Sequence, residues 1–162
     1  MGQAEQVADE VFRVADHEID WSIAVAGMFA VALPLLTGLA LGEATLGLLG
    51  ALGGLNVALV VPGREVSDRW SWGLLCLVGS VVAIALADIT QPSIAASVVA
   101  TFVWTSAWST LRVAGKHGAL TGFALGAVFI ITNGLPAQPL GQAAAAVAVG
   151  GTVALVLMLI AG

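Results

Sequence analysis

Residues 21–41 read WSIAVAGMFAVALPLLTGLAL, a run without a single charged side chain. A helix needs about 20 apolar residues to cross the hydrocarbon core of a bilayer, and this run meets that requirement. The rest of the chain is similar: 59% of its 162 residues are apolar, 9% are charged, and the mean hydropathy is +1.03. A soluble domain carries about 25% charged residues. The composition therefore indicates a polytopic membrane protein and excludes a soluble enzyme or a nucleic-acid binder.

Five more apolar segments follow, separated by Gly, Pro and charged residues that punctuate helices. They cover about 44–61, 70–87, 92–111, 118–132 and 140–161, so the third and fifth of the six spans are short. Pro92 is expected at the start of the fourth helix, and Asp88 is expected to cap this helix, the alternative being that it takes up a proton. The sequence thus predicts an all-α fold with six transmembrane helices over residues 21–162. Residues 1–20 are predicted to form an amphipathic interfacial segment, which either packs beside the bundle or contacts a partner protein.

The basic residues predict the orientation of these spans. With six spans, all five cations fall on one side of the membrane: Arg13, Arg64, Arg69, Arg112 and Lys116. Cytoplasmic loops carry the excess of Lys and Arg in membrane proteins. We therefore expect both termini in the cytoplasm, in a multi-pass protein of the plasma or inner membrane.

Four of these cations, Arg64, Arg69, Arg112 and Lys116, are candidate substrate-binding residues. They would ring the cytoplasmic mouth of the bundle, where positive charge raises the local concentration of anions. The same residues would also be there if they served only to fix the orientation.

Asn56, within the second span, is the fifth candidate for substrate binding. An amide in lipid needs a partner, so Asn56 either bonds across helices or contacts a substrate. The fourth span adds weaker signals, since hydroxyls can bond back to their own helix: Thr101, Thr105, Ser106 and Ser109. No motif for a catalytic nucleophile, a metal or a cofactor is present. We therefore expect no enzyme activity, no metal and no cofactor.

Glycines recur four residues apart inside the predicted spans. The pairs are Gly38 with Gly42 and Gly50 with Gly54, and Gly118, Gly122 and Gly126 form an overlapping series. Such spacing leaves one helix face without side chains, so a neighbouring helix can approach closely. We expect these faces to pack within the bundle; one of them could instead form a homodimer seam or line a narrow pathway.

Spans one to three resemble the transmembrane half of the fusaric-acid-resistance (FUSC) and aromatic acid exporter family. The resemblance rests on Leu33-Pro34-Leu35-Leu36-Thr37-Gly38, on the Leu/Gly/Ala run 46–55, and on a basic turn before a span with Gly73 and Gly79. It implies six helices per unit, working in pairs, that export organic anions such as aromatic carboxylates. Arg69 matches the arginine before the third span and would face the anion, with Arg64 beside it.

Members of that family usually continue into a cytoplasmic domain, whereas this sequence stops at Gly162. We therefore expect a homo-oligomer, dimeric or higher, or a unit of a larger membrane assembly. The leading hypothesis is a permease that exports small aromatic-carboxylate-type anions. The alternative is an accessory subunit of a membrane complex without transport of its own.

Overall fold

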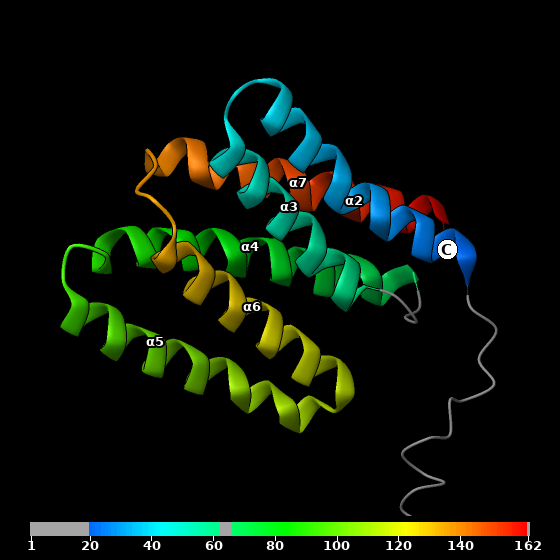
Figure 1. Cartoon of the computed structure of the whole chain (residues 1–162). Helices are drawn as coiled ribbons and strands as arrows, with labels where there is room; N and C mark the ends of the chain where they lie inside the picture. The colour runs from blue at the N-terminus through cyan, green and yellow to red at the C-terminus, as the bar shows by residue number, and fades with distance from the viewer. Residues whose placement is uncertain (1–19, 62–65, 162) are drawn as a thin grey trace, which may run out of the picture.

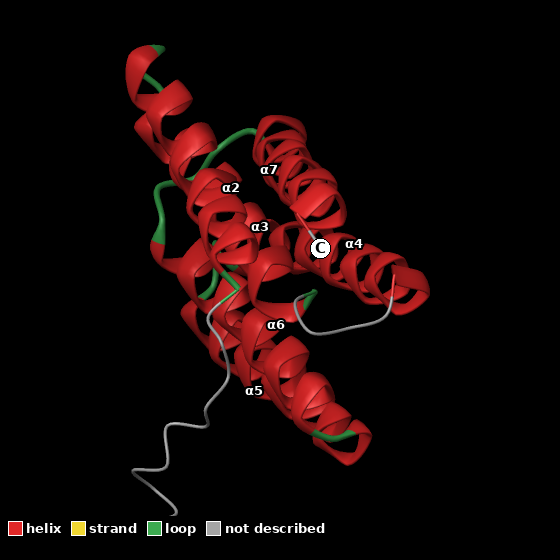
Figure 2. Ribbon diagram, turned by 90° about the vertical axis from the view of Figure 1, so that its right-hand side faces the viewer, coloured by secondary structure: helices red, strands yellow, loops and turns green. Residues whose placement is uncertain are grey.

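The computed structural model describes residues 20–61 and 66–161, and this part of the chain is helical without strands (Figures 1 and 2). Six α-helices and one short 3₁₀-helix follow one another. They are α2 Trp21–Ala40, α3 Ala44–Val60, α4 Val66–Thr90, α5 Ile94–Ser109, η1 Thr110–Ala114, α6 Lys116–Gly134 and α7 Leu140–Ala161. The predicted N-terminal segment and Arg64 lie outside the described residues.

The predicted all-α class is confirmed, and the helix limits agree closely with the six apolar segments. Three details were wrong. Pro92 precedes the N-cap Ser93 and lies in the turn before α5. The third segment gives the longest helix, with 25 residues. Asp88 lies inside that helix and does not cap the next one; the cap of α5 is Ser93, whose hydroxyl oxygen accepts from the Ala96 amide.

Three helices are long and apolar enough to cross a membrane: Trp21–Ala40, Asp68–Thr90 and Leu140–Ala161. The other three, α3, α5 and α6, are shorter apolar helices. Large apolar side chains cover the outside of the structure; Ile94, Phe102 and Phe123 are each at least 70% exposed. A water-soluble protein seldom exposes apolar area on this scale. Helix length and surface together indicate a membrane protein.

Successive helices run in opposite directions because their connections are short (Figure 1). We call the end at which α2, α4 and α6 begin the cation end, since Arg69, Arg112 and Lys116 belong to it. The other end, with residues 41–43, 91–93 and 135–139, is called the turn end. The order in space differs from the order in sequence: α7 packs against α2, α3 and α4, while α2 and α5 lie on opposite sides of the bundle.

The core lies among α3, α4, α6 and α7. Its largest buried cluster contains Leu49, Ala83, Ile84, Ala87, Val128, Phe129, Ala143 and Val147. A second cluster joins α2, α3 and α7, and a third joins α3, α4 and α6. Helix α5 contributes no buried residue and lies against α6 and α4 from outside.

Glycine contacts hold the helices of the core close together, as the spacing predicted. Gly50 of α3 meets Gly150 of α7, and a Cβ on Gly150 would collide with the Gly50 carbonyl oxygen. Gly54 meets the carbonyl of Ala30, which Pro34 in the same helix leaves without its usual N–H donor. Gly42 differs from the prediction, because it lies in the α2–α3 turn with a φ of 77°. The prediction that the glycine faces pack within the bundle is confirmed for Gly38, Gly50, Gly54 and Gly122. Each of these glycines faces another helix or its backbone.

Candidate functional site

Arg69 lies near the start of α4 and is buried, with 8% of its surface exposed. Its Nη1 donates to the carbonyl oxygen of Met158 in the last turns of α7, at 3.3 Å. A helix C-terminus carries partial negative charge and unpaired carbonyls, so a guanidinium stabilises it. The side chain predicted to face an anion therefore ties α4 to the end of α7.

The first turn of α2 meets the same end of α7. The hydroxyl of Ser22 lies 2.7 Å from the carbonyl oxygen of Ala161 and 2.6 Å from Oδ1 of Asp20. Asp20 is the N-cap of α2 and accepts from the backbone amides of Ser22 and Ile23. These bonds, above all the one from the Ser22 hydroxyl, hold the pKa of the Asp20 carboxyl below its ordinary value. At the cation end, polar contacts thus connect both α2 and α4 to the end of α7.

Asn56 is buried between α3 and α4 and bonds across these helices, one of its two predicted roles. Its Nδ2 donates to Oγ of Ser80 at 3.1 Å, and the Ser80 hydroxyl donates to the carbonyl of Cys76 at 2.7 Å. Asn56 and Arg69 are not brought together: Ser80 lies 11 residues along α4 from Arg69, or about 16 Å along the axis.

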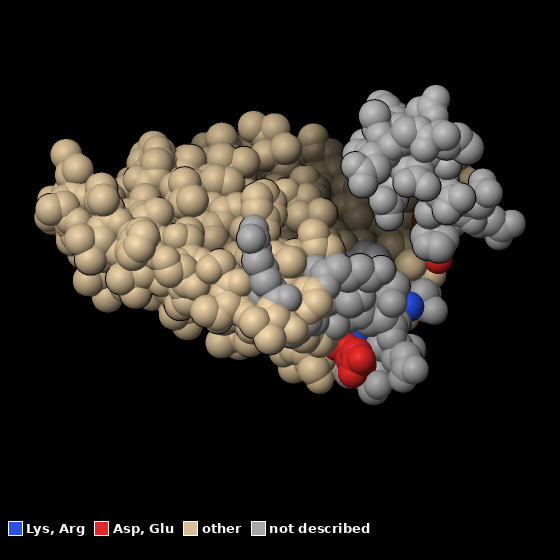
Figure 3. Space-filling view, turned by 90° about the horizontal axis from the view of Figure 1, so that it is seen from below, with Lys and Arg blue, Asp and Glu red and all other residues tan. Residues whose placement is uncertain are grey.

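Arg112 and Lys116 reach the cation end on different elements from Arg69. Arg112 belongs to η1 and Lys116 is the first residue of α6, both at the end of the α5–α6 pair. Figure 3 views the molecule from the α5 side. The charged side chains that are coloured there, which do not include Arg112 or Lys116, gather at one end, and the remaining described surface of that face is uncharged.

A mostly apolar groove with a stripe of hydroxyl residues on its α5 side runs along α5 and α6, and we call it the α5–α6 groove. It consists of two adjoining hollows of approximately 360 and 510 Å³ that share Thr105. Ser97, Thr101, Thr105 and Ser109 follow one another at intervals of four along α5 and all line it. Residues four apart lie on one helix face. The groove therefore carries a polar stripe for most of the length of α5, with Gly122 and Gly126 on its α6 side.

The hydroxyls of this stripe donate to backbone carbonyls. Thr101 donates to Ser97 and Thr105 donates to Thr101, each at 2.7 Å. To bind a carboxylate, a hydroxyl would exchange a neutral hydrogen bond for a charge-assisted one, which is about twice as strong.

Asn133 lines the groove at its turn end. Its Oδ1 accepts from the Ser97 hydroxyl at 3.1 Å, and its Nδ2 donates to Phe129. Ser97 and Asn133 were not among the predicted binding residues. Ser97 could have been found from its spacing of four with Thr101 and Thr105, whereas Asn133 comes from a different helix.

The tryptophans divide between two environments. Trp21 and Trp70 are exposed at the cation end, as interfacial residues are expected to be. Trp72 and Trp108 pack instead against the third buried cluster. Trp104 lies edge-on to Trp108 and donates to the carbonyl of Leu125 at 2.9 Å, so the aromatic rings fix α5 on α6.

Among the described residues, no three His, Cys, Asp or Glu side chains gather into a group able to hold a metal ion. Comparisons with protein-family models, with curated proteins and with solved structures find no match. The class that fold and surface define is therefore a helical membrane protein with a groove on one side that carries a stripe of hydroxyl residues.

Proposed function

We propose that all six α-helices cross the membrane, with both termini in the cytoplasm, in the plasma or inner membrane. The placement of charge supports this topology. Between Arg69 and Asp88, α4 carries no charge over 18 residues, or about 27 Å, which matches a hydrocarbon core of about 30 Å. Helices α3 and α5 have 17 and 16 residues, a shortfall that local thinning of the bilayer accommodates.

Cysteine labelling tests this topology. In a Cys76→Ala background, Val113→Cys marks the cation end and Glu43→Cys marks the turn end; Val113 is 95% exposed. We expect an impermeant thiol reagent to label Glu43→Cys from outside and Val113→Cys only after the membrane is opened. Labelling of Val113→Cys in intact cells would overturn the orientation.

Within this topology, we propose that the protein is a permease unit that exports small organic anions of the aromatic carboxylate type. The observation that carries the proposal is the hydroxyl stripe of the α5–α6 groove, which ends beside the elements carrying Arg112 and Lys116. The stripe supplies hydroxyl side chains that a carboxylate could bind, in exchange for the hydrogen bonds that they donate to their own helix. The FUSC-like residues of the first three spans support the same class of substrate.

Flux into liposomes tests the permease. The purified protein is reconstituted, and uptake of a panel of aromatic and dicarboxylic acids is measured. We expect saturable flux that falls in Thr101→Val/Thr105→Val and in Arg112→Gln/Lys116→Gln. Thr152→Val is the matched control, because Thr152 is exposed on α7 and donates to its own helix in the same way. Unchanged flux in the groove variant would remove the groove from the pathway.

The alternative, an accessory subunit of a larger membrane complex, has one observation in its favour. The glycine contacts and the three buried clusters leave the described interior of the bundle closely packed. A folded, reconstituted sample without flux that co-purifies with a second membrane protein would favour this function over the permease.

A further inference from the structure

A groove opens between α2 and α7, with α3 as its floor, and we call it the α2–α7 groove. It has a volume of approximately 660 Å³. Its lining comes from residues 33–41 of α2, from residues 43–50 at the start of α3 and from residues 142–153 of α7. The groove therefore occupies only the turn-end half of these helices. It is separate from the α5–α6 groove, because α2 and α5 lie on opposite sides of the bundle.

The groove exists because α2 and α7 touch in one half of the bundle and separate in the other. Toward the cation end, Ala30 of α2 belongs to the same buried cluster as Ala154 and Met158 of α7. Toward the turn end the two helices diverge, as Figure 1 shows. Gly47 and Gly50 of α3 line the floor there and have no side chain to fill the space.

The length of the groove corresponds to one leaflet of a bilayer. From Gln142 to Val153, α7 rises about 16 Å, and half of a hydrocarbon core of about 30 Å is about 15 Å. A spanning helix of a second copy would need both leaflets, but the buried contact between α2 and α7 closes the groove halfway along. A single acyl chain extends over one leaflet only, so the groove fits an acyl chain better than a helix.

The polarity of the groove is that of a phospholipid. Glu43 and Gln142 lie at the turn end, and Thr37 lies in the last turn of α2. All the other lining residues are Leu, Pro, Val, Ala or Gly, and they continue to Leu33 and Val153 near the middle of their helices. The polar groups thus lie at head-group depth, and the rest of the groove presents an apolar surface to a chain.

The charge at the turn end distinguishes between head groups. Glu43 is the only ionisable lining residue of the groove, and Asp88 is the other charged residue near this end. No Lys or Arg occurs between residues 14 and 63, between 70 and 111 or after residue 116, so the turns of this end carry no cation. Opposite charges attract and like charges repel. A head group with an ammonium is therefore favoured over one with a net negative charge.

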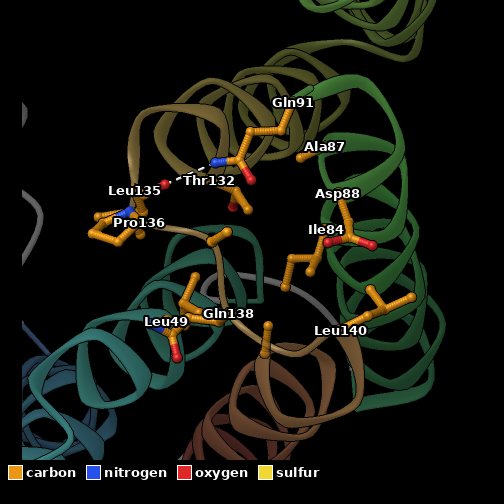
Figure 4. Close-up of a pocket in the computed structure, with 12 residues that line it drawn as sticks. Leu49, Ile84, Ala87, Asp88, Gln91, Thr132, Leu135, Pro136, Gln138 and Leu140 are labelled. Carbon is orange, nitrogen blue, oxygen red and sulfur yellow. Dashed lines mark hydrogen bonds between the residues drawn. The ribbon is translucent and has the colours of Figure 1, made fainter. Parts of the chain in front are cut away.

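A second hollow at the turn end is too small for a lipid. It has a volume of approximately 20 Å³ and lies between the ends of α4 and α6 and the start of α7 (Figure 4). Nε2 of Gln91 donates there to the carbonyl oxygen of Leu135 at 2.8 Å. One water molecule fits this space and would satisfy the hydroxyl of Thr132, which bonds to none of the described residues. Asp88 lines this hollow and not the groove, so it serves as a control for Glu43.

We propose that the α2–α7 groove binds one phospholipid with an ammonium head group, of the phosphatidylethanolamine type. One acyl chain lies along the groove, and the ammonium lies beside Glu43. In the proposed topology the turn end faces outward, so this lipid belongs to the outer leaflet. The binding itself depends on neither the orientation nor the permease, because it is measured on the purified protein without any solute.

Native mass spectrometry of the full chain in detergent tests the head group. The protein is freed of lipid and incubated with phosphatidylethanolamine or phosphatidylglycerol that carry the same acyl chains. Exposed ion pairs contribute modestly, so we expect occupancy by one lipid per chain to be about two- to fivefold higher for phosphatidylethanolamine. Glu43→Gln should bring the two lipids to equal occupancy, whereas Asp88→Asn should keep the preference of the parent protein.

Bulky side chains test the place of the acyl chain. Ala145→Phe/Val149→Phe fills the groove, since both residues line it, are exposed and lie about one helical turn apart. Val156→Phe/Ile160→Phe is the matched control, because these exposed residues of α7 have the same spacing and lie outside the groove. We expect the groove variant to lose the bound lipid and the control to keep it. Circular dichroism shows whether both variants are folded.

Photocrosslinking locates the lipid in the parent chain without any substitution. Phosphatidylethanolamine with a photoreactive acyl chain should label residues 33–41 and 142–153 in preference to the exposed surface of α5. Equal occupancy by the two lipids would overturn the head group. Even labelling of all exposed helices, or lipid retained by the groove variant, would overturn the groove as its site. A dimer lost in the groove variant but kept in the control would overturn the proposal in favour of a seam between two copies.

Discussion

Arg69 of α4 and the carbonyl of Met158 in α7 are joined by a hydrogen bond of 3.3 Å, although 89 residues separate them in the chain. The bond places a buried guanidinium on the C-terminal turns of the last helix. It gives a structural reason for an arginine at this position that is independent of any bound anion.

We expect Arg69→Gln to destabilise the bundle by about 1.5–3 kcal/mol, the range for a hydrogen bond to a charged group. Thermal unfolding in detergent, compared with Asp68→Asn at the exposed neighbouring position, measures the loss. If Arg69 instead faces a transported anion, the variant would lose flux while its Tm stayed at the parent value.

The Asn56–Ser80 pair is expected to couple α3 to α4. Ser80→Ala would leave Nδ2 of Asn56 buried without an acceptor, so each single variant should lose stability and the double variant less than their sum. Interhelical hydrogen bonds of this kind contribute about 0.6–2 kcal/mol in membrane proteins. A double-mutant cycle with Asn56→Ala and Ser80→Ala measures the coupling; additive losses would show that the bond contributes nothing.

The contact between Gly50 and Gly150 should tolerate no side chain. We expect Gly150→Leu to separate α3 from α7 and to lower the Tm strongly, since overpacking alone costs about 1–3 kcal/mol even where the backbone can shift. Gly141→Leu is the control on the same helix, because a Cβ at Gly141 meets nothing within 4 Å. Equal Tm values for the two variants would contradict the close helix contact.

The N-cap at Asp20 predicts a pH dependence. The pKa of this carboxyl is lower in the folded protein than its ordinary value of 3.8, so the unfolded chain binds its proton first as the pH falls. The stabilisation is therefore complete above that ordinary value and is lost as the pH falls through the lower, folded-state pKa.

The difference in Tm between the parent protein and Asp20→Ala measures this effect. We expect a difference at neutral pH that shrinks below pH 3.8. Ser22→Ala removes the hydrogen bond from the Ser22 hydroxyl to the Asp20 carboxylate, which contributes most to the lowered pKa. The folded-state pKa should then lie closer to 3.8, and the Tm difference should disappear over a narrower pH interval. A Tm difference independent of pH would mean that the Asp20 side chain stabilises the N-terminus of α2 without its negative charge.

The all-α class, the number of apolar helices and most of their limits could be predicted from the sequence alone. The predicted limits of α7 are those observed, Leu140–Ala161, and the predicted limits of α3 differ from Ala44–Val60 by one residue. These limits are predictable because Gly, Pro and charged residues interrupt apolar runs locally. The glycine spacing also predicted that backbones would meet. These features depend on neighbours in the chain, which a sequence displays directly.

The partners of the polar groups were decided only by the tertiary structure. Apolar residues surround each helix on nearly all sides, so periodicity does not mark the buried face. The sequence therefore could not tell that α7 packs beside α2, that Arg69 reaches Met158, or that Asp88 stays within α4. The hydrogen bond from Nε2 of Gln91 to the carbonyl oxygen of Leu135 likewise joins residues that lie 44 positions apart in the chain. Such contacts follow from which small-residue faces fit together, and that fit is a property of the folded bundle.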